Sequence, residues 1–487
     1  MIYPTLRQFK ELGKKYKMIA VSKDIEGDME TPITLFKKLK NSGKIYLLES
    51  VETEEKRGRY SFIGRNPFIT IKAYDDKVFI DKNNRTYVKK GSPLQIVKKI
   101  MGNYSAPYIE SSPDFTGGAV GYIGYDIARN YRNLPNINRD DINLPDLHLF
   151  LTKEVIVYDH VRQKITIIVN TPTEGKNGED YEAAVEMIKR IEKEILTKKI
   201  PSQKTKYGLL DIKYNSNETK NSFIEKVNKA KQYIEKGEIS QVVLSQRLEV
   251  QTELNPLEVY RNLRGINPSP YLFYIGSGDY QIIGSSPELM VKVKNNSIKT
   301  CPIAGTRPRG KTLQEDEQLI KELLNDEKEV AEHLMLLDLA KEDIENISKK
   351  ETVKVESYMD ICKCSHVMHI KSTVTGELKE NYDMYDALIT CLPAGTLSGS
   401  PKTRAMEIID ELENKKRGVY GGAIGYFGFN GNMDTCITIR SILFKDKKAY
   451  LQSGAGIVSY SDAEKEYEET ERKLEALMQT IKISAKT

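Results

Sequence analysis

Two pairs of glutamates give the clearest chemical pattern in this sequence. Glu329 and Glu332 lie three residues apart in EKEVAEHLMLLDLA, and Glu466 and Glu469 repeat that spacing in SDAEKEYEETERKL. Residues three apart share one face of a helix. Each pair alone is typical of a solvated helix face, but together the carboxylates of both helices could meet across a cleft. Such a cleft would suit Mg2+, which binds few protein carboxylates and retains several water ligands.

Glycine-rich segments predict a pocket for a small anion. The segment LPAGTLSGSPKTRAMEIIDELE runs from a loop into a helix that Ser400 is expected to cap, with Pro401 in the first helical position. Free N–H groups at such a helix start attract anions. PIAGTRPRG (302–310) adds a tight basic turn, Arg440 ends the run ITIR, and Gly454-Ala455-Gly456 follows the next strand. These segments predict a polyanion pocket held by backbone amides and a few cations, without the GxxxxGK[ST] phosphate loop.

The composition is that of a globular protein. Of the 487 residues, 39% are hydrophobic and 29% are charged, and no apolar run is long enough to cross a bilayer. Residues 1–20 lack the apolar core of a secretory signal, so we expect a cytoplasmic protein. The 74 basic and 69 acidic residues are mixed along the chain, without the clustered basic and aromatic residues typical of nucleic-acid binding. We therefore expect neither a nucleic acid nor a membrane as a partner.

The cysteines favour free thiols in a reducing compartment, because their number, five, is odd. Cys362 and Cys364, followed by His366 and His369, leave a zinc site open as an alternative. That spacing matches no standard zinc finger, and the sequence has no second closely spaced cysteine pair. Cysteines that only pack in the interior are the favoured interpretation.

A polar stretch at residues 200–221 indicates a linker between an N-terminal region, 1–200, and a C-terminal region, 221–487. The two regions share one internal echo, which reads GGAVGYIGYD at 117–126 and GGAIGYFGFN at 421–430. Both copies alternate small and aromatic residues, as a strand closely approached by other backbones would. We therefore expect the two regions to contribute related strands to one structure.

The predicted elements indicate an α+β fold with large antiparallel β-sheets and flanking helices, because strands come in runs with helices between the groups. Ser461 is expected to cap the last helix, with Glu464 completing a capping box. The predicted helices are residues 181–197, 223–236, 313–347, 402–412 and 462–481. The predicted strands are residues 45–48, 61–63, 78–80, 155–157, 164–169, 241–249, 272–275, 436–444 and 449–452.

A series of motifs in the C-terminal region identifies a family. They are SSPELMV, PIAGTRPRG, EHLMLLDLA, SHVMHI, LPAGTLSGSPKTRAMEII, YGGAIGYFGF, GNMDTCITIRS and SGAGIVSYSDAEKEYEET. Because of these motifs, the chain resembles the chorismate-utilising enzymes from about Asn221 to Thr480. In the N-terminal region, LLESVETEEKRGRYSFIG at 47–64 is similar to the start of anthranilate synthase large subunits. The resemblance implies an α+β sandwich of two interwoven subdomains.

Two positions discriminate between members of this family. Members that add water at C2 of the ring carry a lysine base in KVVLSR, where this chain has Gln241 in QVVLSQR, and a neutral amide cannot deprotonate water. The aminodeoxychorismate synthases carry a lysine in PIKGTR that forms a covalent adduct at C2, where this chain has Ala304. The resemblance therefore implies that ammonia attacks C2 directly, which is the anthranilate reaction.

The resemblance also implies roles for the glutamate pairs. Glu332 and Glu469 would hold Mg2+, with Glu329 and Glu466 acting behind them or through water. The metal would bind the ring carboxylate and stabilise charge that develops during attack at C2. The familiar motif DLARND departs here to DLAKED, so Lys341 and Glu342 replace an Arg–Asn pair that is not expected to touch the metal.

The other roles implied by the resemblance concern the substrate. Glu288 would protonate the departing 4-hydroxyl as general acid, with Gln241 beside the attacked carbon. His369 would assist the loss of pyruvate and of the C2 proton, although a lone histidine is more often a satisfied core residue. The residues expected to bind chorismate are Gly305, Thr306, Thr396, Tyr420, Arg440, Gly454, Ala455, Gly456 and Lys473.

Partners and regulation also follow from the resemblance. No cysteine lies in a Gly-x-Cys-x-Gly elbow, so a separate glutamine amidotransferase subunit (component II) is expected to supply ammonia, in a heterotetramer. Tryptophan is expected to inhibit the enzyme. The implied inhibitor site comprises Glu49, Ser50, Pro270, Tyr271, Leu272 and Cys436, although LLES by itself is equally typical of a buried strand end.

Three other functions are alternatives to that of an anthranilate synthase subunit. An aminodeoxychorismate synthase subunit would differ in the position of amination. A non-catalytic amino-acid sensor would keep the LLES pocket, but the presence of Glu288, Glu332 and Glu469 argues against lost chemistry. A basic protein of RNA or membrane surfaces is disfavoured by the dispersed charge.

Overall fold

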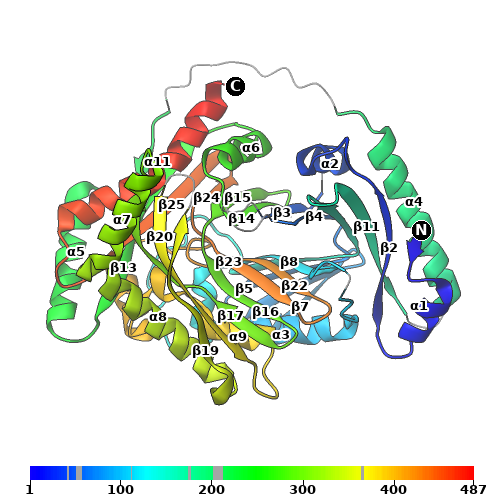
Figure 1. The fold of residues 1–487 in the computed structure, drawn as a ribbon, viewed down its shortest axis with the longest axis horizontal. Coiled ribbons are helices and arrows are strands. Elements are labelled where there is room, and N and C mark those ends of the chain that lie inside the picture. Colours follow the sequence, from blue (N-terminus) through cyan, green and yellow to red (C-terminus); the bar gives the residue numbers. More distant parts are fainter. Residues whose placement is uncertain are drawn as a thin grey trace.

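The computed structural model describes residues 1–40, 43–50, 58–110, 112–173, 177–200, 212–363 and 367–486. These residues form two large antiparallel β-sheets with helices around them (Figure 1), which confirms the expected α+β class. Within these ranges, no helix is both long and apolar enough to span a membrane. Most of the predicted linker, residues 201–211, lies outside the described residues, as do Cys364 and His366.

The first sheet contains strands from both regions of the chain. Its strands are β1 (Ile2–Tyr3), β2 (Met18–Glu26), β3 (Ile45–Glu49), β4 (Tyr60–Arg65), β10 (Glu154–Asp159), β11 (Lys164–Pro172), β12 (Asn215–Ser216), β13 (Gln241–Gln251), β14 (Tyr271–Gly276), β15 (Tyr280–Ser286), β21 (Gly399–Ser400), β24 (Ser441–Lys445) and β25 (Lys448–Ile457). They follow the order β1-β2-β11-β10-β4-β3-β14-β15-β24-β25-β13-β12, and β21 also pairs with β13.

The second sheet also contains strands from both regions of the chain. Its strands are β5 (Ile69–Tyr74), β6 (Lys77–Lys82), β7 (Arg85–Lys90), β8 (Gly118–Ile123), β9 (Leu147–Thr152), β16 (Leu289–Lys294), β17 (Ser297–Thr300), β18 (Ile303–Pro308), β19 (Lys354–Lys363), β20 (Val367–Glu377), β22 (Ala423–Gly428) and β23 (Met433–Ile437). They follow the order β18-β20-β17-β16-β23-β22-β8-β9-β5-β6-β7, with β19 also paired to β20. Because each region supplies strands to both sheets, the two halves are interwoven, as expected.

Most of the longer helices lie in groups near the two ends of the molecule. They are α1 (Leu6–Leu12), α2 (Pro32–Leu39), α3 (Pro93–Met101), α4 (Asn177–Thr197), α5 (Lys220–Glu235), α6 (Pro256–Ile266), α7 (Leu313–Asn325), α8 (Glu327–Ile347), α9 (Met384–Cys391), α10 (Lys402–Leu412) and α11 (Ala463–Lys486). Short 3-10 helices are η1 (Gly102–Tyr104), η2 (Tyr125–Asn130), η3 (Lys350–Thr352) and η4 (Gly395–Leu397). Helices α5, α7, α8 and α11 lie at one end of the molecule, with α1 and α4 at the other (Figure 1).

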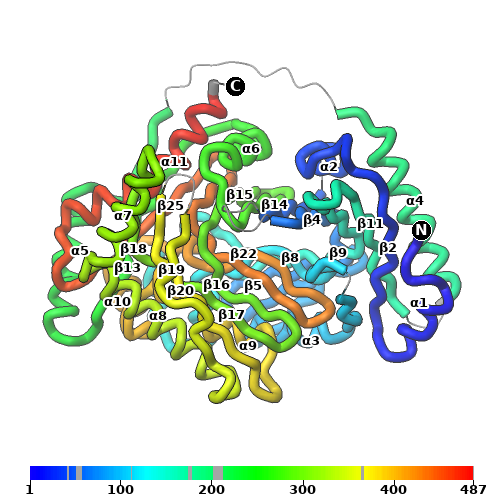
Figure 2. The backbone as a smooth tube through the Cα atoms, in the orientation of Figure 1, coloured from blue at the N-terminus to red at the C-terminus, as the bar shows by residue number. Residues whose placement is uncertain are grey.

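The internal echo lies at the centre of the second sheet. Strands β8 and β22 lie side by side (Figure 2). They pair antiparallel, which brings Gly121 opposite Gly425. A Cβ on Gly121 would lie 2.0 Å from the carbonyl oxygen of His148, and a Cβ on Gly425 would lie 2.0 Å from that of Asp434. Real Cβ atoms do not approach so closely, so these positions require glycine. The expectation of related strands in one structure is confirmed.

Two predicted elements are each divided in the structure. The helix expected at 313–347 ends before Asp326, whose carboxylate accepts the N–H groups of Lys328 and Glu329 at 3.1 and 3.3 Å and caps α8. The strand expected at 436–444 breaks near Arg440, which adopts a left-handed φ of 51°. There the chain crosses from β23 in the second sheet to β24 in the first. Both predictions were wrong because the local pattern of apolar residues continues through each break.

The two expected serine caps are also wrong. Asp462, not Ser461, accepts the N–H groups of Glu464 and Lys465 at 3.1 and 3.0 Å, because its carboxylate lies next to the first turn of α11. The Ser461 hydroxyl instead accepts the N–H of Val458. Ser400 belongs to β21, and Pro401 occupies the N-cap position of α10 without a side-chain cap.

Candidate active site

The glycine strand β25 meets helix α8 and strand β13 at one place. Gly456 pairs with Val243 of β13, two residues beyond Gln241. A Cβ on Gly456 would lie 2.5 Å from Nε2 of Gln241 and 3.8 Å from Oε1 of Glu332. The absence of a side chain at Gly456 therefore leaves room for both groups. Neighbouring Ala455 is buried and faces the apolar cluster of α5 and α10.

The glutamate pairs of α8 and α11 lie close to one another in the structure. Burial raises the pKa of Glu332 to about 7, and the negative charges of Glu329 and Glu469 add to this shift. Burial also raises the pKa of Glu466, with the charge of Glu469 contributing. Carboxylates shift one another's pKa in this way only when they lie close together in a partly desolvated place.

Cations already neutralise part of this acidic group. Lys473 Nζ lies 2.6 Å from Glu469 Oε1, and Arg307 Nη1 lies 3.2 Å from Glu329 Oε1. Among the described residues, no three or more His, Cys, Asp or Glu side chains are arranged to hold a metal ion as they stand. The remaining repulsion at Glu332 is nevertheless of the kind that a divalent cation relieves, so the donor set fits Mg2+ chemically.

Glu288 has the properties of a general acid. It lies between β15 and β16, and only 7% of its surface is exposed. Burial raises the pKa of its carboxyl to about 8, although the hydrogen bond from Thr396 and the charge of Lys473 lower it in part. Thr396, in the η4 turn, donates to Oε1 over 3.0 Å. A carboxyl with this pKa is mostly protonated at neutral pH and can donate a proton.

Tyr420 and Lys473 approach the glycine strand, and Arg440 contacts Lys473. Arg440 Nη1 donates to the backbone carbonyl of Lys473 at 2.7 Å, and burial lowers the pKa of the Arg440 guanidinium. Lys473 Nζ donates to the carbonyl of Gly454 at 3.0 Å. The Tyr420 hydroxyl would lie 3.1 Å from a Cβ on Gly454, and burial raises its pKa. Two cations and a hydroxyl thus gather where carboxylates of a small acid could bind.

His369 lies on β20 opposite Thr306 of β18. Its Nδ1 lies 3.0 Å from the carbonyl oxygen of Gly305 and 3.1 Å from the hydroxyl of Thr306. Because a carbonyl only accepts, Nδ1 carries the proton in this bond, and Nε2 bears the lone pair. Burial lowers the pKa of His369, so the neutral form, which can accept a proton, is favoured. Gly305 has a φ of 73° at a bulge in β18, which favours glycine there.

The two positions that discriminate between reactions are both buried. Gln241 is 2% exposed, and its Oε1 has no hydrogen-bond partner among the described residues. Ala304, which precedes the bulge at Gly305, is 9% exposed. The Gln241 amide turns its Nε2 towards Gly456, and its buried, unpaired Oε1 can accept an N–H donor.

The residues of the expected inhibitor site lie on or directly beside β3, β14 and β23. Glu49 pairs with Leu272, and its buried carboxylate accepts the Tyr260 hydroxyl at 2.6 Å and lies 3.3 Å from Arg264. The carboxylate is therefore already engaged within the protein. Tyr271 donates its hydroxyl to Asp434 at 3.0 Å. Leu272 and Cys436 are buried, whereas Ser50 and Pro270 are partly exposed.

The same region adjoins Glu288 through backbone contacts. Cys436 pairs with Leu289, the residue after Glu288, and the N–H of Ile437 donates to the carbonyl of Glu288 at 3.0 Å. Tyr271 pairs with Ser286, whose hydroxyl accepts the N–H of Glu288 at 3.4 Å. A ligand on this face could therefore reach Glu288 through neighbouring strands.

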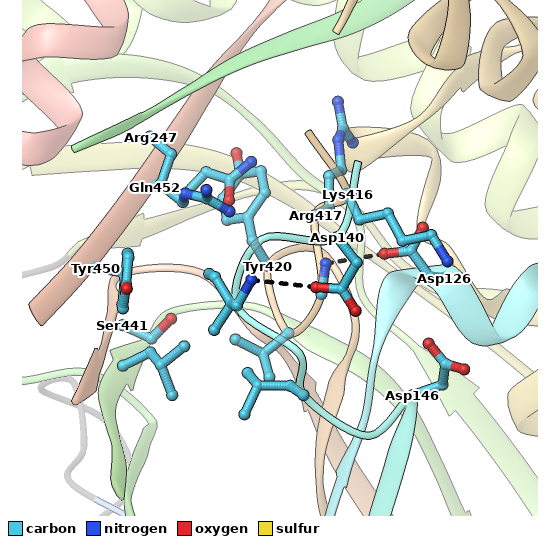
Figure 3. A pocket seen from close by; sticks show the side chains of 15 residues that line it. Asp126, Asp140, Asp146, Arg247, Lys416, Arg417, Tyr420, Ser441, Tyr450 and Gln452 are labelled. Atoms are coloured by element: carbon cyan, nitrogen blue, oxygen red, sulfur yellow. Dashed lines mark hydrogen bonds between the residues drawn. The ribbon is translucent and has the colours of Figure 1, made fainter. Parts of the chain in front are cut away.

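Two cavities flank the candidate site. One, of about 40 Å³, lies against Tyr420 and is lined by Arg247, Arg417, Ser441 and Gln452 among others (Figure 3). The other, of about 30 Å³, adjoins Glu288 and Thr396 and is otherwise lined mostly by apolar side chains. Sequence reasoning did not single out Arg417, whose only sequence signal is a charge shortly before the second glycine-rich echo at 421–430.

Comparisons with known proteins identify the family of this chain. Residues 43–479 match the family described as chorismate binding enzyme. Anthranilate synthase component 1 of Acetivibrio thermocellus is 53% identical over 99% of both chains, and that of Aquifex aeolicus is 42% identical over 99% of this chain and 98% of its own. The crystal structure of anthranilate synthase component I from Streptococcus pneumoniae TIGR4 has 38% identity and a TM-score of 0.79, covering 93% of this chain and 98% of its own. The chain therefore belongs to the chorismate-binding enzymes and, within them, to the anthranilate synthase component 1 family.

Proposed function

We propose that this enzyme converts chorismate and ammonia to anthranilate and pyruvate. The observation that carries this proposal is the pairing of a buried acid, Glu288, with two buried positions that lack a lysine, Gln241 and Ala304. A site without a lysine base does not activate water, and a site without a lysine nucleophile forms no adduct with the ring. Ammonia needs neither, because neutral ammonia is a strong enough nucleophile to attack the ring without first losing a proton.

The first step is amination of the ring. Ammonia attacks C2, the double bonds of the ring shift, and the C4–O bond breaks. Glu288 gives its proton to the departing hydroxyl, which leaves as water, and the new amine then loses its extra proton. The vacant Oε1 of Gln241 accepts an N–H of the incoming ammonia and orients its lone pair towards the ring.

The second step is loss of pyruvate. His369, neutral and with its lone pair on Nε2, takes the proton from C2. The C3–O bond breaks, the ring becomes aromatic, and the released enolate takes up a proton to give pyruvate. Arg440, Lys473 and Tyr420 hold the substrate carboxylates through both steps, while Gly305, Thr306, Thr396 and the glycine strand shape the ring site.

A divalent cation belongs to this proposal. Glu332 and Glu469 would hold Mg2+, with Glu329 and Glu466 acting through water, and the Lys473–Glu469 ion pair would loosen on binding. When bound, Mg2+ supplies positive charge beside the ring carboxylate. The raised pKa of Glu332 supports this assignment, because a cation would offset the repulsion that raises it.

The proposal extends to a partner and an inhibitor. The relatives are named component 1, which implies a second component. We assign to it the release of ammonia from glutamine, within a heterotetramer. Tryptophan would bind at Glu49, Ser50, Pro270, Tyr271, Leu272 and Cys436 and would act on Glu288 through the strand contacts of β14 and β23.

One assay tests the reaction. The purified chain is incubated with chorismate, Mg2+ and an ammonium salt at mildly alkaline pH, and anthranilate is followed by its fluorescence. Chromatography of the products separates the ortho-amino acid from the para isomer of an aminodeoxychorismate route. A para product, or no consumption of chorismate, would contradict the proposal.

A further inference from the structure

Arg417 is a buried cation in the turn that precedes β22. Its side chain is 1% exposed, and it forms an ion pair with Glu413, with Nη2 at 2.6 Å from Oε1 and Nε at 2.9 Å from Oε2. A guanidinium stays charged even when buried, so it requires such a partner. One carboxylate does not use all five N–H donors of arginine.

The remaining donors of Arg417 connect two segments of the candidate site. Nη1 donates to the carbonyl oxygen of Leu397 at 2.6 Å, and Nη2 donates to that of Val243 at 2.8 Å. Leu397 directly follows Thr396, the residue that donates to Glu288. Val243 lies two residues beyond Gln241 on β13. One planar group therefore holds the η4 turn at a set distance from β13.

The face of the same guanidinium contacts aromatic rings. It lies 4.7 Å from the ring centroid of Tyr125 and 5.8 Å from that of Tyr420. Figure 3 shows Arg417 and Tyr420 lining the same cavity. A cation over an aromatic face is attracted by the ring electrons, and the attraction is stronger where water is excluded. Tyr420 is thereby fixed against the η4 turn and β13.

Glu413 carries the connection to a further strand. Its Oε1 also accepts the N–H of Ser245 at 2.9 Å and the Ser245 hydroxyl at 2.8 Å. Ser245 Oγ in turn accepts Nε2 of Gln452 at 2.8 Å. Gln452 lies two residues before Gly454 on β25. The Arg417–Glu413 pair thus contacts, directly or through one side chain, the η4 turn, β13 and β25.

We propose that Arg417 is a positioning residue for the reaction, which it serves by holding the backbone of Thr396 so that the threonine hydroxyl meets Glu288. This inference rests on the proposed function, because it needs Glu288 to act on chorismate. Lysine cannot replace arginine in this role, since a single ammonium lacks the planar fork that reaches a carboxylate and two carbonyls together. The alternative is that Arg417 only stabilises the fold.

A double-mutant cycle separates the two roles. The turnover number, kcat, for chorismate consumption is measured from chorismate absorbance for wild type, Arg417→Lys, Thr396→Val and the double variant. Each single change is expected to lower kcat about tenfold or more, with a smaller change in KM. If Arg417 acts through Thr396, the double variant is no slower than the slower single variant. Multiplied losses in the double variant would overturn the proposal.

A matched control addresses stability. Arg65 is also buried, and it forms ion pairs with Glu154 and Glu194 and donates to the carbonyl of Leu39. These partners lie on α2, β10 and α4 rather than around the proposed ring site. Arg65→Lys is expected to lower Tm about as much as Arg417→Lys while leaving kcat unchanged. Equal losses of kcat in both variants would show that lost stability, not positioning, explains the effect.

A second variant guards against misfolding of Arg417→Lys. Arg417→Gln combined with Glu413→Gln removes both charges together, so that neither is left buried and unpaired. It is expected to stay folded and to lose kcat, because the fork to Leu397 and Val243 is gone. Wild-type kcat in this variant would overturn the inference. The identity of the wild-type product, by contrast, tests only the proposed function, because the cycle follows chorismate loss whatever the product.

Discussion

The hydroxyl of Thr396 donates to Oε1 of Glu288 over 3.0 Å, although the two residues are 108 positions apart in the sequence. The bond joins the η4 turn before α10 to the loop between β15 and β16. It fixes the direction in which a buried carboxyl points, and its partial lowering of the pKa of Glu288 is outweighed by burial. The η4 turn thus orients the carboxyl of the proposed acid, and burial keeps it protonated.

Replacement of Glu288 by glutamine is expected to leave chorismate binding largely intact and to lower the rate of the reaction strongly. The amide keeps the size of the acid but cannot donate a proton to the 4-hydroxyl, which typically costs about a hundredfold or more in rate. Chorismate affinity, measured by equilibrium binding, should stay close to that of wild type. A Glu288→Gln variant with full kcat would remove Glu288 from the mechanism.

The same variant gives a prediction for stability. Burial raises the pKa of Glu288 from its ordinary 4.5 to about 8, so between these values the folded state binds a proton that the unfolded state has released. The contribution of Glu288 to stability is therefore fully present below the pKa that its carboxyl has in the unfolded chain. This contribution is lost as the pH rises through the pKa of the folded state. Glutamine mimics the protonated form and does not titrate.

Thermal unfolding of both proteins without ligands measures this effect. The Tm of Glu288→Gln minus that of wild type should grow in favour of the variant as pH rises from about 5 to about 9. Other titrating groups cancel in the comparison because both chains share them. A difference independent of pH would mean that Glu288 is not held protonated in the folded protein.

Removal of either proposed metal carboxylate is expected to abolish Mg2+-dependent turnover. Glu332→Gln and Glu469→Gln each delete an anionic oxygen from a cation that has few protein ligands. Turnover is measured during titration with Mg2+. Glu468→Gln serves as the matched control, because Glu468 is an exposed neighbour on α11. Wild-type Mg2+ dependence in both site variants would show that the metal lies elsewhere.

The chain alone is expected to use ammonia but not glutamine. Among the described cysteines, Cys301, Cys391 and Cys436 are buried, and burial raises the pKa of the Cys391 thiol, which makes it a poor nucleophile. Anthranilate fluorescence is compared with ammonium or glutamine as the nitrogen source. Glutamine-dependent product from the pure chain would contradict the need for a separate amidotransferase.

Substitution of Ser50 by phenylalanine is expected to abolish inhibition by tryptophan with little change in turnover. The bulky ring fills the proposed pocket, and Ser50 lies on a different segment from the proposed metal carboxylates of α8 and α11. Inhibition requires that tryptophan bind the inactive arrangement more tightly than the active one. Tryptophan titrations at fixed chorismate compare the two proteins.

Reciprocity supplies a control for that experiment. Chorismate should weaken tryptophan binding by the same factor by which tryptophan weakens chorismate binding. A variant as sensitive as wild type, or a wild type indifferent to millimolar tryptophan, would remove the inhibitor site. Glu49 would then remain a buried strand-end carboxylate held by Tyr260 and Arg264.

The chemical inventory and the local elements could be predicted from the sequence. The spacing of Glu329 with Glu332 and of Glu466 with Glu469 identified helix faces, because helical period is a local property. The paired glycine echoes predicted strands under close approach, since only glycine lacks the Cβ that would collide. The family motifs around Glu288 and Gln241 could be recognised in the same way, because each is a short contiguous segment.

Long-range packing could not be predicted in this way. The break at Asp326 and the crossover at Arg440 interrupt segments whose local pattern does not change, so only contacts with other parts of the chain decide where they occur. No local pattern marks Arg417, because its partners Leu397 and Val243 are distant in sequence and accept through backbone carbonyls. The sequence by itself determined which side chains are available and, through the helical and strand periods, which of them share a face. The tertiary structure decided which of these side chains meet, through the pairing of distant strands, and which are charged, through the exclusion of water.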